Sequence, residues 1–150
     1  MKLWIPTVIL ALAAILPLQA QSNEVLDTVL EREALRFGEA AYLVLVGSGR
    51  LSDTASLEEA AQTVAKAFPR VPSRAADEWI PLGEYAYLLM QAFEVKGGLM
   101  YRLIPGPRYA ARELAYREMI RGKAHPGLPV EGAQAVQILR RLLEWKETLS

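Results

Sequence analysis

Two tyrosines and two arginines flank a proline-rich turn near the middle of the chain. They are Tyr101, Arg102, Arg108 and Tyr109, and the turn lies within an elbow formed by residues 97–107. Arginine recognises carboxylate and phosphate groups through two parallel hydrogen bonds, and a tyrosine ring can stack on a sugar or a peptide. We therefore expect these four residues to form the candidate binding surface. The alternative is that they cover helix ends and pair with nearby glutamates.

Acidic residues on either side of the elbow offer a second kind of chemistry. Glu84 precedes the elbow and Glu113 follows it. A carboxylate works as a general acid or base when it is held within hydrogen-bonding reach of the substrate. A small periplasmic enzyme that uses Glu84 or Glu113 with Arg102 and Arg108 is therefore the alternative to a binding module. Glu84 also counts among the candidate binding residues.

Other reactive groups find little support in the sequence. The single histidine, His125, lies in a turn before a Pro-Gly pair and has no neighbouring ligand or nucleophile pattern. The segment 47–49, Gly-Ser-Gly, lacks the lysine and the glycine spacing of a phosphate-binding loop, so we interpret it as a helix terminator. The chain has no cysteine, which removes thiol nucleophiles and thiolate metal sites. We predict no metal and no cofactor.

The start of the chain has the pattern of a secretory signal peptide. Lys2 is followed by an apolar run from Leu3 to Leu18 and then by small residues at Ala20 and Ser22. A basic start, an apolar centre and small residues at the cleavage position are typical of such a signal. We predict a signal peptide over residues 1–22 and a periplasmic or secreted protein. An uncleaved membrane anchor is the alternative, because the run approaches the ~18 residues of a spanning helix.

Charge and composition restrict the partners of the mature chain, residues 23–150. Without Lys2 the chain has 16 basic and 17 acidic residues. This balance lacks the basic excess that is typical of nucleic-acid-binding proteins. We expect no nucleic-acid partner and no membrane insertion after signal cleavage. Without disulfides, one exported domain of this length must be held together by its hydrophobic core.

Helical periodicity, interrupted by glycine and proline, predicts the elements that position the elbow. A first helical pattern begins near Asn23 and reaches the glycines at 47–49, with Gly38 as the expected break. The apolar run at 41–46 could also be a buried strand. We favour a helix because no second strand candidate exists to pair with it. Ser56 and Glu59 form a capping box at the start of the next helix, and Pro69 ends that helix.

The most apolar helix begins at Pro81 and is expected to end at the Gly-Gly pair at 97–98. Its apolar residues lie on nearly all sides, which indicates a central position. The preceding connection, residues 69–81, should be tied to the core by Trp79 and Ile80. One helix follows the elbow and another follows Pro129. Lys146 lies near the end of the last helix, where its positive charge suits the negative pole of that helix.

A weak internal repeat and a family resemblance lie within these elements. Residues 39–42, Glu-Ala-Ala-Tyr, match residues 113–116, Glu-Leu-Ala-Tyr, at an offset of 74, and residues 68–93 look like a partial third copy. Three features follow one another in the sequence: the pattern Phe-Pro-x-Val-Pro at 68–72, then Trp79, then a helix that starts near proline. This order resembles the S-layer homology domain of bacterial envelope proteins. The resemblance spans roughly residues 37–143.

The resemblance to the S-layer homology domain implies an all-helical repeat module. Members of that family bind cell-wall-linked polymers and anchor their carriers. The family's Thr-Arg-Ala-Glu motif falls on residues 82–84 and 130–132, where only Glu84 keeps a matching residue. The sequence therefore predicts an exported, single-domain, all-α protein of about five helices, and the internal matches suggest two to three helix-loop-helix repeats. We expect a non-catalytic envelope module that binds a wall polymer or an envelope protein, or else a structural oligomer subunit with an exposed apolar patch.

Overall fold

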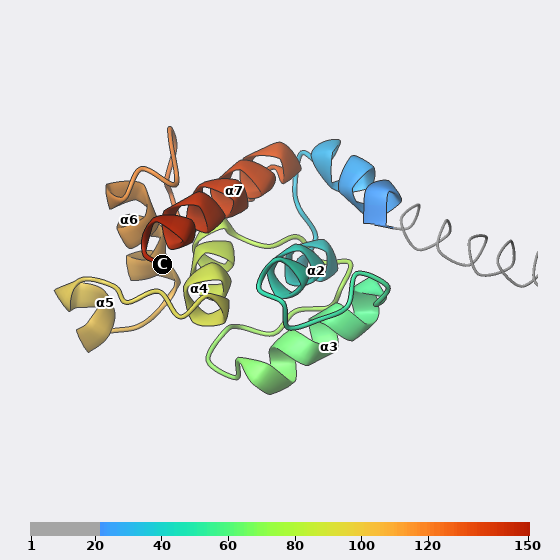
Figure 1. The fold of residues 1–150 in the computed structure, drawn as a ribbon, viewed down its shortest axis with the longest axis horizontal. Helices are drawn as coiled ribbons and strands as arrows, with labels where there is room; N and C mark the ends of the chain where they lie inside the picture. Colours follow the sequence, from blue (N-terminus) through green and yellow to red (C-terminus); the bar gives the residue numbers. More distant parts are fainter. Residues whose placement is uncertain (1–21) are drawn as a thin grey trace, which may run out of the picture.

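Three inner helices contribute most of the core in the computed structural model, which describes residues 22–150 (Figure 1). They are α2 (Phe37–Gly47), α4 (Leu82–Ala92) and α7 (Gly132–Thr148). Nine of the eleven residues of α2 and ten of the eleven residues of α4 are buried. The central position of the helix after Pro81 is confirmed, and the ambiguous apolar run before residue 47 is helical. The predicted signal peptide lies outside the described residues except for Ser22.

Three outer helices cover the inner ones. A helical segment at 22–30 precedes α2, α3 (Leu57–Ala67) precedes α4, and α6 (Pro107–Tyr116) precedes α7. Helix α2 packs against α3 and α4 packs against α6, while the start of α7 lies beside residues 22–30 (Figure 1). Each inner helix therefore packs against the outer helix of another repeat. The described chain is one all-α domain, as the sequence predicted, and residues 22–150 contain no strand. These residues form seven helices, whereas about five were predicted, and six of the seven make three helix-loop-helix repeats.

A ring of three backbone hydrogen bonds joins the repeats at the N-terminal ends of the inner helices. The amide of Leu35 donates to Val130 at 2.8 Å, the amide of Ile80 donates to Leu35 at 2.9 Å, and the amide of Val130 donates to Ile80 at 3.4 Å. All three residues are fully buried. Each lies two residues before its inner helix, so positions 35, 80 and 130 are equivalent. We call this arrangement the backbone ring.

The backbone ring corrects the register of the predicted repeat. The offset of 74 pairs Glu39 of the inner helix α2 with Glu113 of the outer helix α6. In the structure the counterparts of α2 are α4 and α7 instead. The short matches around these glutamates reflect the alanine and glutamate content of helices in general. The correct register does have a sequence signal, because residues 38–43, Gly-Glu-Ala-Ala-Tyr-Leu, match residues 83–88, Gly-Glu-Tyr-Ala-Tyr-Leu, at an offset of 45. The sequence-based prediction rested on the shorter match at an offset of 74 instead.

Several helix ends differ from the prediction. The first helical pattern breaks at residues 31–36 instead of at Gly38, because Leu35 is extended to join the backbone ring. Helix α4 ends at Ala92, five residues before the Gly-Gly pair. Glu94 adopts the left-handed conformation, with φ 53°, and the amide of Val95 donates to Met90 at 2.9 Å. This is the usual helix-ending geometry, but with glutamate in the position that glycine normally holds.

Local signals near the other helix starts are largely confirmed. The Ser56 hydroxyl accepts a 3.1 Å hydrogen bond from the Glu59 amide, which caps α3. Ile80 is fully buried, as expected, but Trp79 is 45% exposed and is therefore not a core contact. The Arg74 guanidinium lies 5.9 Å from the Trp79 ring and covers part of it. None of the helices within residues 22–150 combines the length and hydrophobicity needed to cross a bilayer.

Candidate functional site

The elbow contains a short helix, α5 (Leu99–Leu103), and a cavity forms between α5 and α6. The cavity has a volume of about 390 Å³. We call it the elbow cavity, and its lining residues are Gly98, Leu99, Met100, Tyr101, Tyr109, Arg112, Glu113 and Tyr116. Tyr101 and Tyr109, two of the predicted site residues, therefore share one cavity.

Tyr101 fastens α5 to the body of the domain. Its side chain is buried, and its hydroxyl accepts a 3.0 Å hydrogen bond from the Gln91 amide at the end of α4. The ring meets Tyr87 edge-on, with 6.2 Å between ring centroids. Burial raises the pKa of the Tyr101 hydroxyl above 10.0, so the ring stays neutral at physiological pH. Tyr101 forms the floor of the elbow cavity and holds its wall in place.

Tyr109 lies under two arginines. The guanidinium carbons of Arg108 and Arg112 are each 5.9 Å from the centroid of its ring. A cation at that distance is attracted to the negative face of the ring, which orients both arginines. Both arginines are exposed, so their hydrogen-bond donors remain accessible to a ligand. Arg108 also lines a neighbouring cavity of about 400 Å³ together with Arg112 and His125.

Glu113 closes the base of the elbow. One carboxylate oxygen accepts a 3.0 Å hydrogen bond from the Gly98 amide, and the other accepts 2.9 Å from Arg117. The Arg117 guanidinium also lies 4.7 Å from the Trp145 ring of α7. Glu113 thus ties the start of α5 to α6 and, through Arg117, to α7. Both of its oxygens are engaged in holding the elbow.

Three predicted site residues, Glu84, Arg102 and Arg108, do not line the elbow cavity. Glu84, at the start of α4, accepts hydrogen bonds of 2.7 and 2.9 Å from the same guanidinium, that of Arg74. Hydrogen bonding to Glu84 is the main reason that the pKa of Arg74 is raised. Arg102 donates a 3.0 Å hydrogen bond to the carbonyl of Gly97 and does not line the elbow cavity. Of the five predicted site residues, the structure therefore brings only Tyr101 and Tyr109 together in the elbow cavity.

Arg112 and Tyr116 are polar lining residues of the elbow cavity that were not among the predicted site residues. They follow Tyr109 at spacings of three and seven residues on α6. Residues at those spacings share one face of a helix, so the helical pattern after Pro107 carried the signal. Tyr116 is 87% exposed. Its ring is available at the rim of the elbow cavity.

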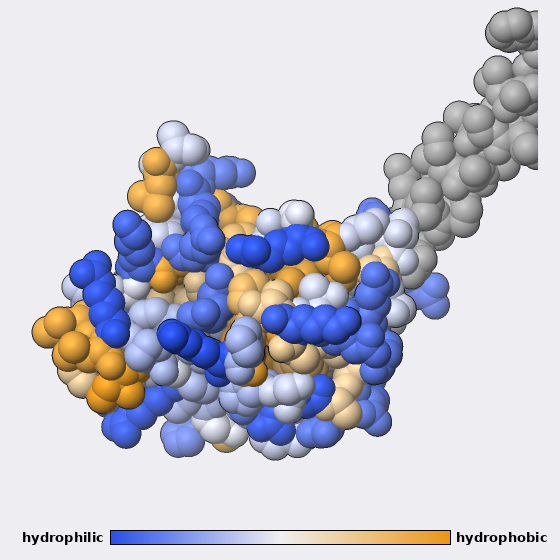
Figure 2. Space-filling view, turned by 90° about the horizontal axis from the view of Figure 1, so that it is seen from below, coloured by the Kyte–Doolittle hydropathy of each residue, from blue (hydrophilic) through white to orange (hydrophobic). Residues whose placement is uncertain are grey.

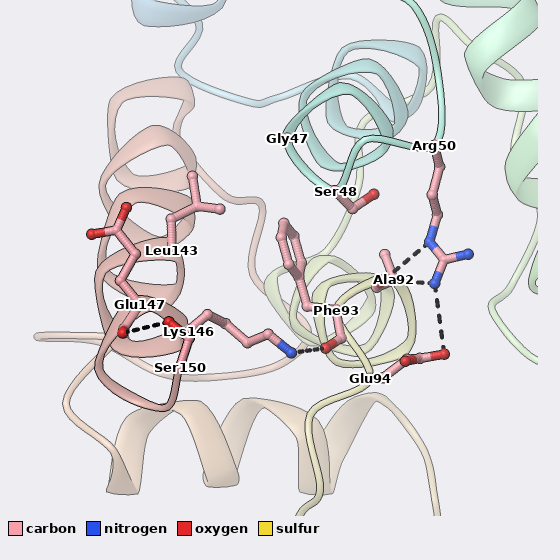
Figure 3. Close-up of a pocket in the computed structure, with 10 residues that line it drawn as sticks. All are labelled: Gly47, Ser48, Arg50, Ala92, Phe93, Glu94, Leu143, Lys146, Glu147 and Ser150. Carbon is pink, nitrogen blue, oxygen red and sulfur yellow. Dashed lines mark hydrogen bonds and ion pairs between the residues drawn. The ribbon is translucent and has the colours of Figure 1, made fainter.

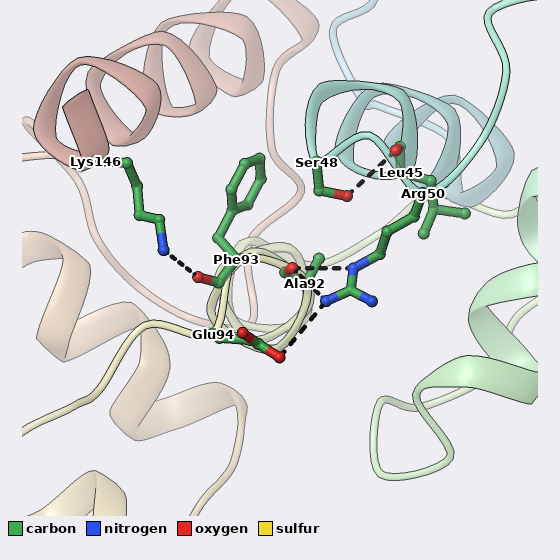
Figure 4. A network of polar contacts seen from close by, with 7 residues as sticks. All are labelled: Leu45, Ser48, Arg50, Ala92, Phe93, Glu94 and Lys146. Atoms are coloured by element: carbon green, nitrogen blue, oxygen red, sulfur yellow. Dashed lines mark hydrogen bonds and ion pairs between the residues drawn. The ribbon is translucent and has the colours of Figure 1, made fainter. Parts of the chain in front are cut away.

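A second cavity, of about 440 Å³, lies where the C-terminal ends of α2, α4 and α7 meet (Figure 3). Arg50 donates to the carbonyl of Ala92 through Nε at 3.1 Å and through Nη2 at 3.0 Å, and Lys146 donates to the carbonyl of Phe93 at 2.8 Å (Figure 4). These carbonyls end α4 and have no helical partner. The two cations of this cavity therefore serve the architecture of the helix ends.

Metal ligation has no preformed site in the described part of the chain. Within residues 22–150 no group of three or more histidine or acidic side chains lies close enough to hold an ion. Comparisons of the chain with protein-family models, with curated proteins and with solved structures return no match. The function is therefore argued from the site itself.

Proposed function

We propose that this protein is an exported, non-catalytic module of the cell envelope that binds a wall polymer in the elbow cavity. The observation that carries the proposal is the grouping of Tyr109, Arg112 and Tyr116 on one face of α6 around an open cavity. Sugar rings stack on exposed tyrosine, and guanidinium groups pair with the phosphate or carboxylate groups of anionic polymers. The site thus combines the two contacts that an acidic glycan needs.

The rigidity of the elbow also supports this proposal. Tyr101 is fixed by Gln91, and Gly98 is fixed by Glu113, so the cavity walls are in place before a ligand arrives. A preformed site loses less conformational entropy on binding. The resemblance to the S-layer homology domain, whose members bind cell-wall-linked polymers, points to the same class of ligand and to the periplasm or cell surface.

A small periplasmic enzyme has less support as the function. Both oxygens of Glu84 accept from Arg74, and both oxygens of Glu113 are bonded to Gly98 and Arg117. A general base must lie within hydrogen-bonding reach of the proton that it abstracts, whereas these carboxylates are held by donors of the protein itself. Neither carboxylate is paired with Arg102 or Arg108, so the catalytic arrangement expected from the sequence is not assembled.

The experiment is cosedimentation of residues 23–150 with purified, membrane-free cell-wall sacculi. These residues contain the whole described core, which runs from Val29 to Leu142. The test variant is Arg112→Ala with Tyr116→Ala, since both side chains are exposed and their loss leaves the core intact. The matched control is Arg140→Ala, an exposed arginine of α7.

We expect wild type and the control to sediment with sacculi and the double variant to lose about tenfold or more in affinity. Soluble folded wild type that stays in the supernatant would refute polymer binding. Unchanged binding by the double variant would move the polymer site away from the elbow cavity.

A further inference from the structure

The short helix α5 presents apolar side chains to solvent. Leu99 is 71% exposed, Leu103 is 67% exposed and Ile104 is 57% exposed, and Met100 is about half exposed. Figure 2 shows them as an apolar cluster at the left edge of the molecule, and Figure 1 shows α5 projecting from the bundle at that edge. Leaving several large apolar side chains together in water is costly, so such a cluster marks an interaction surface.

The charges of the sequence stretch that contains this cluster have one sign. Four cations lie within residues 95–112, and this stretch contains no acidic residue. All four are exposed: Lys96, Arg102, Arg108 and Arg112. The acidic residues on either side are Glu94, which lies 3.9 Å from Arg50, and Glu113, which is bonded to Arg117. The apolar cluster therefore has a basic border.

We propose that α5 docks this protein on the surface of an anionic phospholipid bilayer. The apolar side chains of α5 enter the boundary between headgroups and acyl chains, and the surrounding cations contact lipid phosphates. Shallow burial of apolar side chains together with attraction of basic residues to anionic lipid is the general basis of peripheral membrane binding. This proposal does not depend on polymer binding in the elbow cavity.

Charge complementarity favours a bilayer over a second copy of the chain. In a symmetric dimer through α5 the same surface would meet itself, so Arg102 and Arg108 would face the cations of the partner copy. An anionic bilayer offers opposite charge across the whole border. It also requires no matching groove, and the side chains of α5 form an outward projection (Figure 2).

The mode of contact differs from membrane spanning. Helix α5 has five residues, and the chain returns to the domain at Pro107. Tyr101 and the bond between Gly98 and Glu113 hold the projection in one orientation. The side chains that reach the bilayer are therefore presented on a fixed support, and the rest of the domain stays in water.

The test is cosedimentation of residues 23–150 with vesicles of phosphatidylglycerol mixed with phosphatidylcholine, compared with vesicles of phosphatidylcholine alone. Residues 1–22 are left out because their apolar run would bind vesicles by itself. One variant is Leu103→Asp with Ile104→Asp, and the other is Arg102→Ala with Arg108→Ala. The matched control is Leu30→Asp, an exposed leucine at the end of the helical segment 22–30, and Figure 1 shows this segment on the side of the molecule away from α5.

We expect wild type and Leu30→Asp to bind the anionic vesicles, and each double variant to lose about tenfold or more in affinity. Binding should also weaken at about 1 M salt, where charges are screened beyond ~3 Å. Circular dichroism establishes that each variant is folded, which is expected because the changed side chains are exposed.

Two results would overturn the proposal. The first is that folded wild type fails to bind anionic vesicles. If wild type instead self-associates, and the variant Leu103→Asp with Ile104→Asp does not, the apolar surface binds a second copy of the chain. The second is vesicle binding that both double variants retain at the wild-type level.

Discussion

Lys146 donates a 2.8 Å hydrogen bond from Nζ to the backbone carbonyl of Phe93, so the last turns of α7 hold the C-terminal end of α4. The sequence predicted that Lys146 would stabilise the negative pole of its own helix. Lys146 does lie in the last turn of α7, and its ammonium group also stabilises the C-terminal pole of the neighbouring α4. The two inner helices are thereby joined at the end opposite to the backbone ring.

Replacing Lys146 with methionine should lower the free energy of unfolding by about 1–2 kcal/mol, because the carbonyl of Phe93 loses a charged donor while the alkyl stem is kept. Urea unfolding measures the change. Lys66→Met is the control, since Lys66 is an exposed cation in the last turn of α3. An equal loss in the two variants would contradict the role assigned to Lys146.

The ion pair between Arg74 and Glu84 should contribute to stability more than a surface pair does. Glu84 is buried, and Arg74 reaches both of its oxygens. Glu84→Gln should cost about 1–3 kcal/mol in urea unfolding, because the paired charge is lost within a partly buried site. Glu78→Gln removes the other partner of Arg74, an exposed carboxylate at 3.6 Å, and should cost less than about 0.5 kcal/mol. Equal costs would show that burial of Glu84 adds nothing.

Gly132 should not tolerate a side chain. A Cβ at this buried position, at the start of α7, would overlap the carbonyl oxygen of Val29. Gly132→Ala should therefore separate residues 22–30 from α7 and lower the free energy of unfolding by about 2–4 kcal/mol. Gly106→Ala is the control, since no atom lies within 4 Å of that Cβ, and should cost less than about 1 kcal/mol. Thermal melts that rank the two variants equally would refute the close approach.

Alkaline pH should destabilise the protein through Tyr85. Its ring is fully buried, and its hydroxyl donates 2.9 Å to the carbonyl of Ala135. Burial raises its pKa far above the ordinary value of 10.0. The folded chain keeps this proton while the unfolded chain releases it above pH 10, so the stability due to Tyr85 is complete below pH 10 and declines above it.

The measurement is urea unfolding of wild type and Tyr85→Phe at several pH values. At neutral pH the variant should be less stable by about 1 kcal/mol, because one hydrogen bond is lost. Above pH 10 this difference should shrink by up to ~1.4 kcal/mol per pH unit. Tyr116→Phe, at an exposed position, should keep the wild-type profile. A constant difference between wild type and Tyr85→Phe would contradict the assignment.

Periodicity was sufficient to predict the inner helices, because burial on all sides leaves an obvious record in a helix such as α4. It failed where the backbone alone decides. Leu35 is an ordinary apolar residue in a helical pattern, yet its amide and carbonyl bond to Val130 and Ile80, and the helix breaks there. Helix α4 ends before Glu94, which adopts the left-handed conformation that glycine usually adopts at a helix end. The sequence offered a Gly-Gly pair three residues later, so the predicted helix end was too late.

The candidate site was predicted in part for a similar reason. Local spacing identified Tyr101 and Tyr109, which do share a cavity, because the elbow folds back on itself over a short distance. Local spacing could not reveal that Arg74, ten residues before Glu84, would form an ion pair with it. Nor could it reveal that Arg102 would donate a hydrogen bond to the carbonyl of Gly97. Such pairings depend on how separate segments meet, which is a property of the tertiary structure.

The backbone ring makes the order of synthesis matter. In an open solenoid each added repeat is stabilised by the one before it. In this protein the amide of Leu35 and the carbonyl of Ile80 find their partner only when Val130 arrives, late in the chain. A nascent chain that has completed two repeats therefore still exposes unbonded backbone groups and uncovered core. We therefore expect folding to be complete only after the third repeat has been synthesised, and a fragment truncated before it to be digested by proteases instead of forming a smaller stable protein.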